Sequence, residues 1–276
     1  MASDQAEPAP RHAAAGALAT AVADLVEGAR RWQLWSMMAR MEIRRRYRRT
    51  WVGPLWTTLS MALIVLALGP LYAKFAMRPF ELYVPHLTLG LIVWTFIANA
   101  ISSACQVFVG AARYLKETGM PLSVFVYRDV HRQAWMMLYH MAAYVAVAAW
   151  FGINPGGYAL LAIPGLALLM VNAVWVGLLI GVVSARFRDI QEMVPVALRL
   201  AFFLTPIIWM PDMLGRYTEY LHVNPFYHYI EVVRAPLLGH APHLLAWPVT
   251  LAITAAGGAA ALALFGRLRW RVVYWV

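Results

Sequence analysis

Six arginines lie between residues 40 and 49 of this 276-residue chain, and an apolar run that begins at Trp51 follows almost at once. Guanidinium groups bind phosphate through paired hydrogen bonds, so such a run can grip nucleic acid or anionic lipid head groups. Nucleic-acid binding would also need a folded reading element, and the surrounding sequence offers none. A basic run directly before an apolar stretch is typical of the cytoplasmic flank of a membrane span. The arrangement therefore favours a membrane anchor, in contact with membrane lipids, over a nucleic-acid site.

One further arginine, Arg199, lies inside an apolar stretch, where an ionised side chain is costly and indicates a functional role. It could line a substrate path, where its planar fork suits a phosphate or a sugar hydroxyl, or it could extend to the head groups. Aromatic rings in other apolar stretches offer faces for sugar rings, although packing would also explain each ring alone. The candidate path residues are Arg199, Trp56, Phe96, Phe202 and Phe203.

The sequence lacks the residues of a phosphate-binding nucleotide loop. That loop requires a lysine directly after a glycine, and the only two lysines, Lys74 and Lys116, follow Ala73 and Leu115. We therefore expect no cofactor in this chain, and any ATP and magnesium that drive it to be bound by a partner subunit. His240 and His243 have a ligand-like spacing, but no cysteine or carboxylate lies close by, so no metal site is expected.

The composition indicates a membrane protein, because 62% of the residues are hydrophobic, only 13% are charged, and the mean hydropathy is +0.61. A bilayer core of about 30 Å needs roughly 20 apolar residues per helix. An all-α polytopic fold is therefore expected, and the turn-forming run 154–157 separates its third span from its fourth. The six predicted spans are 51–72, 87–112, 133–153, 158–185, 193–210 and 244–266.

The distribution of basic residues predicts the orientation of these spans. With the N-terminus inside, the cytoplasmic segments hold eighteen lysines and arginines and the outer segments hold four. Both termini are therefore expected in the cytoplasm. Residues 1–30 are rich in alanine and are expected to form a mobile cytoplasmic tail, followed by a transmembrane domain over residues 31–276.

Two segments outside the spans are expected to lie at the membrane surfaces. An amphipathic helix before the first span should rest in the cytoplasmic interface with its apolar side in lipid. Its residues are Trp35, Met38, Met41, Arg44, Arg45, Arg46 and Tyr47. Between the fifth and sixth spans, prolines bracket a short helical run in which Glu231 and Arg234 can pair. This run is expected to form re-entrant half-helices at the outer face, with an outer gate of Asn224, Pro225, Glu231 and Arg234.

The loop between the second and third spans, residues 112–125, mixes charged and apolar residues before a Gly119-Met120-Pro121 break. A short amphipathic element of this kind can dock into a groove on a soluble partner, although a solvated connector would look the same. The candidate contact residues are Arg113, Tyr114, Leu115, Lys116, Glu117 and Thr118.

Several segments, taken together and in order, resemble the membrane subunit of ABC-2-type polysaccharide exporters, which carry O-antigen, capsule or teichoic acid chains. The similarity covers about residues 30–270. It rests on "RYRRTWVGPLW", "RYLKETGMPLSVF", "ARFRDIQEMVP", "FFLTPIIW" and "LHVNPFYHYIEVVRAPLLG".

The resemblance implies a homodimer of six-span subunits in the bacterial cytoplasmic membrane, with two separate ATPase subunits beneath it and a lipid-linked glycan as its substrate. It also implies that Arg113 to Ser123 is the coupling element, that Arg31 to Arg49 is the interface helix, and that Asn224 to Gly239 forms the outer gate.

Two alternatives remain at this point. An ABC-2 exporter of a drug or lipid would share the architecture but should have a more uniformly apolar path. A membrane-bound transferase of lipid-linked sugars would need catalytic carboxylates or histidines at one membrane face. Asp129, Asp189 and Glu192 lie at the predicted inner face, but arginines stand beside each, and ion pairing accounts for them.

Overall fold

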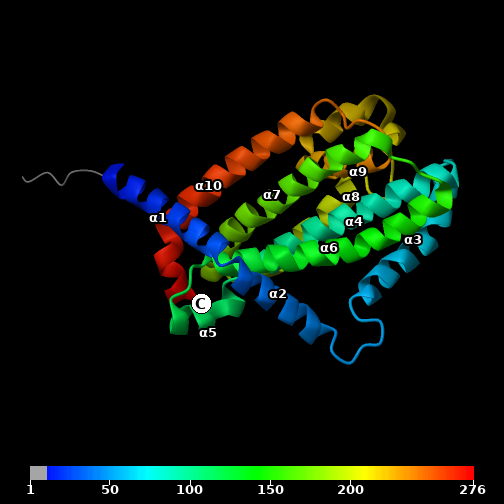
Figure 1. The fold of residues 1–276 in the computed structure, drawn as a ribbon. Helices are drawn as coiled ribbons and strands as arrows, with labels where there is room; N and C mark the ends of the chain where they lie inside the picture. Colours follow the sequence, from blue (N-terminus) through cyan, green and yellow to red (C-terminus); the bar gives the residue numbers. More distant parts are fainter. Residues whose placement is uncertain (1–10) are drawn as a thin grey trace, which may run out of the picture.

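A computed structural model describes residues 11–276, and over that range the chain is built from helices joined by short turns (Figure 1). Five helices are long and apolar enough to cross a membrane: α3 (Leu55–Phe75), α4 (Phe80–Ala104), α6 (Ser123–Phe151), the segment that ends in α7 (Ala159–Arg186), and α10 (Ala246–Trp275). The shorter elements are α1 (Arg11–Arg30), α2 (Trp32–Arg46), η1 (Val109–Ala111), α5 (Ala112–Thr118), η2 (Gly156–Tyr158), α8 (Ile190–Leu204), η3 (Pro211–Val223) and α9 (Pro225–Leu237).

The all-helical fold agrees with the sequence prediction, and so does the break between the third and fourth spans. Gly152 ends α6 with a φ of 65°, a left-handed conformation that glycine adopts without steric cost. The side chain of Asn154 then accepts a hydrogen bond of 3.0 Å from the backbone N–H of Gly156, which closes a tight turn. This turn joins two antiparallel helices of similar length.

The predicted span boundaries differ from the helix ends at several places. α4 begins before the predicted residue 87 and ends at Ala104, where a 3-10 turn and α5 begin. α6 begins at Ser123, before the predicted residue 133, and carries Arg128, Asp129 and Arg132 within its first turns. The prediction began this span after the charged residues and therefore placed its start too late. In the structure these residues lie on one face of the helix and form ion pairs there.

The predicted fifth span, 193–210, is a shorter helix than expected. α8 has 15 residues and ends at Leu204, where Thr205 turns to an extended conformation before Pro206. At 1.5 Å per residue, α8 is roughly 22 Å long, below the bilayer core of about 30 Å. Among the described residues, five helices rather than six meet the length and composition of a membrane span.

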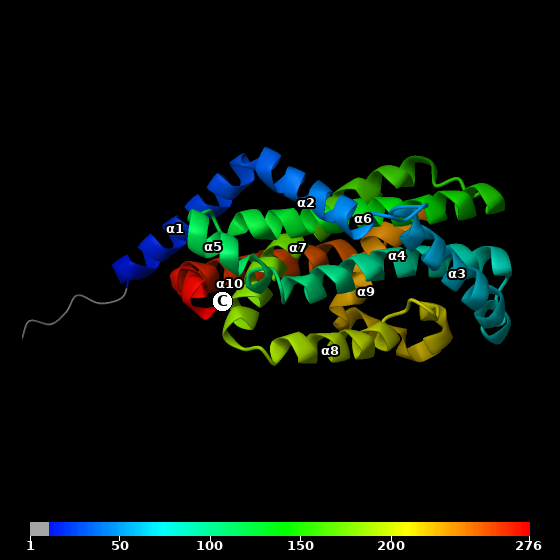
Figure 2. The same ribbon diagram turned by 90° about the horizontal axis from the view of Figure 1, so that it is seen from below.

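α4 is at the centre of the bundle, whereas α8 lies on its edge. The apolar segment of α4 is 67% buried, against 17% for α3, and its side chains join the largest buried cluster. α8 fully buries only Leu198 and exposes most of its other side chains along one side of the bundle, opposite α2 and α6 (Figure 2). α9 is short but buried, and it packs among α7, α10 and α4.

The N-terminal region differs from its prediction. Residues 1–10 of the predicted mobile tail lie outside the described residues, but residues 11–30 form helix α1, which packs on α10 and α6. Ala21 of α1 is fully buried and Asp24 nearly so. An alanine-rich helix can pack closely through small residues, and Leu25 is the one large apolar residue of α1 that packs against this buried cluster, too few to form a stripe in the sequence.

Candidate functional site

The most prominent site is a groove formed by α2, the first turns of α6, and the turn between α4 and α5. Two adjoining hollows of about 510 and 760 Å³ make up this groove, and they share Glu42, Arg45, Gly110 and Arg128. Two carboxylates, Glu42 and Asp129, also line it. We call it the basic groove, because six arginines line it: Arg44, Arg45, Arg46, Arg48, Arg128 and Arg132.

Helix α2 forms one wall of the basic groove because its small residues pack on α6. Ser36, Ala39 and Ile43 recur at helical spacing and are buried in this contact. Trp35 also faces the protein, and its ring centroid lies 5.1 Å from that of His131 on α6. The predicted apolar stripe is therefore split, with Trp35 on α6 and Met41 exposed at 61% of its surface.

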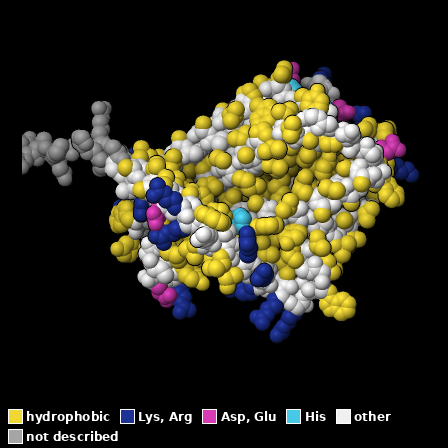
Figure 3. All heavy atoms as spheres, viewed as in Figure 1, with side chains coloured by type: hydrophobic (Ala, Val, Ile, Leu, Met, Phe, Trp, Pro, Cys, Tyr) yellow, Lys and Arg dark blue, Asp and Glu magenta, His cyan; other side chains and the backbone are white. Residues whose placement is uncertain are grey.

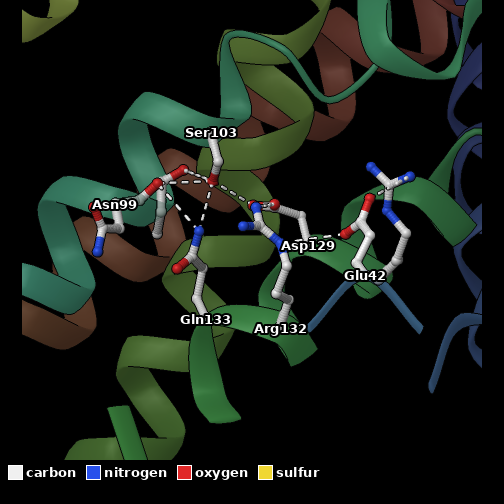
Figure 4. Close-up of polar contacts among 8 residues, drawn as sticks. Glu42, Asn99, Ser103, Asp129, Arg132 and Gln133 are labelled. Atoms are coloured by element: carbon white, nitrogen blue, oxygen red, sulfur yellow. Dashed lines mark hydrogen bonds and ion pairs between the residues drawn. The ribbon is translucent and has the colours of Figure 1, made fainter. Parts of the chain in front are cut away.

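A polar network joins the three helices at the groove (Figure 4). The Glu42 carboxylate of α2 bridges two arginines of α6, at 3.5 Å from Arg128 and 3.4 Å from Arg132. Arg132 also pairs with Asp129, which accepts a hydrogen bond from Ser103 on α4. Glu42 and Asp129 thus fix the arginines in place without neutralising all of them.

The network continues one turn deeper into the bundle. The amide of Gln133 donates to the hydroxyl of Ser103 at 3.0 Å and to the backbone carbonyl of Asn99 at 3.4 Å. Our sequence reasoning missed Glu42, Ser103 and Gln133. The signal for Ser103 and Gln133 is a pair of polar residues four apart on each of two apolar helices, Asn99 with Ser103 and Asp129 with Gln133.

The guanidinium groups of the basic groove retain hydrogen-bonding capacity. The side chains of Arg128 and Arg132 are only 12% and 21% exposed, and their Nε–H groups are buried without a hydrogen bond to the described residues. The Nε of Arg132 lies 3.4 Å from the Glu42 carboxylate. Glu42 approaches both but is shared between them. Six arginines against two carboxylates leave an excess of positive charge, which suits a multiply charged anion such as a phosphate or pyrophosphate.

Basic side chains gather at the same edge on the surface. On the face shown in Figure 3, most lysine and arginine side chains lie along the edge made by α1, α2 and α5, below a broad apolar surface. Such a distribution, with an apolar flank and a charged edge, fits a chain whose basic end meets the head groups of a membrane.

The predicted coupling residues form helix α5, which lies beside the basic groove. Tyr114 lines the groove, and Leu115 is buried in the cluster that also contains residues of α1 and α10. The other four are exposed, with Arg113 paired to Glu117 at 3.0 Å: Arg113, Lys116, Glu117 and Thr118. α5 therefore presents a charged outer face and anchors itself by Leu115.

The predicted path residues do not form one site. Arg199 is exposed on α8, where it forms no ion pair with any described residue, and Phe203 is exposed on the same helix. Phe202 packs on Trp94 of α4, with ring centroids 5.7 Å apart. Trp56 is exposed on α3. Phe96 is only 3% exposed and belongs to the core cluster, where it also lines an apolar hollow of about 330 Å³.

The predicted outer gate residues lie together at the other end of the bundle. The Asn224 side chain caps α9 by accepting a hydrogen bond of 2.9 Å from the N–H of Phe226. It also donates to the carbonyl of Leu204 at 3.2 Å and thereby ties α9 to the end of α8. Pro225 occupies the first turn of α9, where its missing N–H costs nothing.

The predicted pair of Glu231 and Arg234 is confirmed, with 3.1 Å between carboxylate and guanidinium. Arg234 is 2% exposed and makes two further contacts. Its Nη1 donates to the carbonyl of Pro206 at 2.7 Å and lies 3.2 Å from the His86 ring of α4. This buried arginine therefore links α9, α4 and the segment after α8.

Neither a metal site nor a set of catalytic carboxylates takes shape in the region that the structure describes. No group of three or more histidine, cysteine, aspartate or glutamate side chains is arranged to hold a metal there. His243 instead packs against the His222 ring, with centroids 4.4 Å apart. Asp129 is buried in its pair with Arg132, whereas Asp189 and Glu192 are exposed at the start of α8.

Comparison with known proteins agrees with this arrangement. The family model described as ABC-2 type transporter matches residues 33–238. An O-antigen export system permease protein, RfbA, from Klebsiella pneumoniae is 23% identical over 250 residues, which cover 87% of this chain and 93% of the relative. A second RfbA of Klebsiella pneumoniae is 23% identical over 197 residues, 70% of this chain and 76% of the relative. The chain belongs to the ABC-2 type transporter family of membrane permeases.

Proposed function

We propose that this chain is the membrane subunit of an exporter that carries a lipid-linked polysaccharide of the O-antigen class across the bacterial cytoplasmic membrane. A separate ATPase subunit supplies the energy. The observation that carries the proposal is the basic groove, in which arginines converge beside apolar helices in a chain otherwise poor in charge. The relatives over most of its length, named as O-antigen export permeases, support the same cargo.

In this proposal the basic groove receives the phosphate-bearing head of the lipid carrier at the cytoplasmic face. Arg128 and Arg132 of α6 line the groove together with the arginines of α2. A pyrophosphate offers several anionic oxygens to such a cluster, whereas a neutral lipid or drug offers no anionic oxygen. The acyl or polyprenyl tail would remain in the membrane beside the apolar flank.

The sugar chain would then follow a path along α8. This helix exposes most of its side chains in one protomer, including Arg199 and Phe203, and a lone exposed arginine in lipid is costly. A second copy of the chain facing α8 would cover its apolar residues and turn Arg199 toward a polar passage. The segment 205–210 after α8 would complete a sixth crossing together with α8 and bring both termini to the cytoplasm.

Deletion of this chain in cells that make the glycan tests the function. We expect loss of glycan from the cell surface, accumulation of lipid-linked glycan inside, and restoration by the wild-type chain. A strain that keeps its surface glycan but loses efflux of a drug or of a sugar-free lipid would contradict the proposal and favour the other class of ABC-2 exporter.

A further inference from the structure

Helix α1 packs closely against α10 and α6 (Figure 1). A side chain at Gly266 of α10 would place its Cβ 2.6 Å from the carbonyl oxygen of Ala17 on α1. A side chain at Gly28 of α1 would place its Cβ 2.1 Å from the hydroxyl of Ser123 on α6. The two glycines allow α1 to touch two other helices at distances that any larger residue would prevent.

Asp24 of α1 supplies the cap that the start of α6 lacks. The first N–H groups of a helix have no partners within it, and Leu122 at the N-cap position has no side chain that can accept their hydrogen bonds. The Asp24 carboxylate accepts from the N–H of Ser123 at 3.0 Å and from that of Leu122 at 3.3 Å. The hydroxyl of Ser123 donates in return to the backbone carbonyl of Asp24 at 2.7 Å.

The same carboxylate faces α10. Arg269 lies 3.4 Å from Asp24 and also donates to the backbone carbonyl of Thr20 at 2.6 Å. Asp24 is 5% exposed, so its negative charge is held between a helix N-terminus and a guanidinium, both of which stabilise it. α1 therefore joins the start of α6 to the C-terminal part of α10 through one buried side chain.

The segment held in this way directly follows α5. α5 has seven residues, too few to be stable alone, and Gly119 ends it in a left-handed conformation with a φ of 58°. Leu115 of α5 and Leu122 pack in one buried cluster with Ala21 of α1 and Val272 of α10. The position of α5 relative to α6 is therefore set by α1 and α10 as well as by the connecting turn.

We propose that Asp24 is a positioning residue for the coupling segment α5, and that α1 is the brace through which movement of α5 reaches α6. The inference rests on the proposed function, because it assigns α5 to the contact with the ATPase partner. With the brace in place, a push on α5 moves the start of α6 directly. Without it, the same push bends the turn at residues 119–122 and is lost.

Four variants of the full chain, assembled with the ATPase partner in lipid nanodiscs, test the brace. Asp24→Ala removes the cap and the contact with Arg269. Asp24→Asn keeps one acceptor oxygen but no charge. Gly28→Leu pushes α1 away from α6 and leaves Asp24 intact. Glu27→Gln is the matched control, because Glu27 lies on the same helix, is half exposed, and pairs with Arg31 directly after that helix.

Two readouts are needed. The first is hydrogen exchange at the N–H groups of Leu122 and Ser123, which we expect to be about five- to tenfold faster in Asp24→Ala, as for loss of an N-cap acceptor. The second is the ratio of glycan moved to ATP hydrolysed, together with the hydrolysis rate of the assembled partner. We expect the ratio to fall at least about threefold in Asp24→Ala and Gly28→Leu, less in Asp24→Asn, and not in Glu27→Gln.

Faster exchange with an unchanged ratio would overturn the proposal, since the cap would then serve stability alone. Unchanged exchange would overturn it as well. If Asp24→Ala does not assemble, Asp24→Asn decides, because the retained oxygen can still cap the helix. If the wild-type complex moves no glycan, the proposed function fails. In that case the hydrolysis rate of the partner tests the brace. It should change in Asp24→Asn and Gly28→Leu but not in Glu27→Gln, and any other pattern overturns the brace.

Discussion

The basic groove and the α9 end of the bundle use arginine in opposite ways. Arg234 at the α9 end is 2% exposed, and a carboxylate, a carbonyl and a histidine ring surround its guanidinium. Arg128 and Arg132 at the other end share the Glu42 carboxylate, Arg132 also pairs with Asp129, and four further arginines line the same groove. An arginine whose donors bond to acceptors of the protein stabilises the fold, whereas an arginine with unbonded donors can bind a ligand.

This comparison also gives the bundle a direction. The α9 end holds a buried ion pair and the capped start of α9, whereas the α2 end carries the two hollows of the basic groove. Under the proposed function, this asymmetry would let the cargo enter at the basic groove. The following predictions test the two halves separately.

The largest effect is expected from Arg234→Ala. The substitution leaves the Glu231 carboxylate and the Pro206 carbonyl buried without their donor, which costs about 3–5 kcal/mol of folding free energy for a broken buried pair. Thermal unfolding of the purified chain in detergent measures it. Arg216→Ala is the control, because Arg216 is exposed and contacts only the neighbouring Tyr217. Equal melting temperatures for the two variants would show that the buried ion pair at the α9 end does not stabilise the fold.

A smaller effect is expected from Asn224→Ala, which removes the cap of α9 and the hydrogen bond to the carbonyl of Leu204. Loss of such a cap costs about 1 kcal/mol, and Asn224→Asp should retain the capping part of it. The same unfolding measurement applies. If alanine and aspartate behave alike, the tie to α8 rather than the cap carries the stability.

A pH dependence is expected from His222 at the same end. Burial, followed by the neighbouring His243 and His228, holds the pKa of His222 below its usual value of 6.5, while Glu219 acts in the opposite direction. Between that lowered pKa and 6.5 the unfolded chain binds more protons, so stability falls as the pH drops through this window. Melting temperatures at pH 7 and pH 5 should differ less in His222→Gln than in the wild type. An identical difference would assign the pH effect to other groups.

The smallest effect on stability is expected from Arg199→Gln. Arg199 is exposed on α8 and has no ion-pair partner in the part of the chain that the structure describes, so its loss should change stability by less than about 0.5 kcal/mol. A loss of stability close to that of Arg234→Ala would contradict the distinction between arginines bonded within the protein and arginines with unbonded donors. A loss of export without loss of stability would support a place for Arg199 on the glycan path.

The sequence was sufficient for features that depend on local pattern. The long helices follow from apolar length, the turn after Gly152 from its Asn-Pro-Gly-Gly run, and the pair of Glu231 and Arg234 from their helical spacing. α5 coincides with the charged segment singled out as a partner contact. In each case the residues that decide the structure are close together in the chain.

The features that were missed depend on residues far apart. α1 packs through Ala21, Gly28 and the distant Gly266, and small residues give no apolar stripe. Phe96 packs in the core cluster, and composition alone cannot tell the core face of α4 from its other faces. Glu42 bridges two arginines some ninety residues later in the chain, a contact that no local spacing indicates.

The central claim is that the arginines of the basic groove bind the phosphate-bearing head of the cargo. Its most direct test is the binding of a polyprenyl diphosphate-linked oligosaccharide to the purified chain in nanodiscs, for the wild type, Arg128→Gln and Arg40→Gln. Arg40 is an exposed arginine of α2 that lies outside the groove. We predict that Arg128→Gln weakens binding about tenfold, as for one lost charge-assisted contact, and that Arg40→Gln leaves the affinity unchanged. Equal affinity for all three proteins, or equal losses in both variants, would contradict the account.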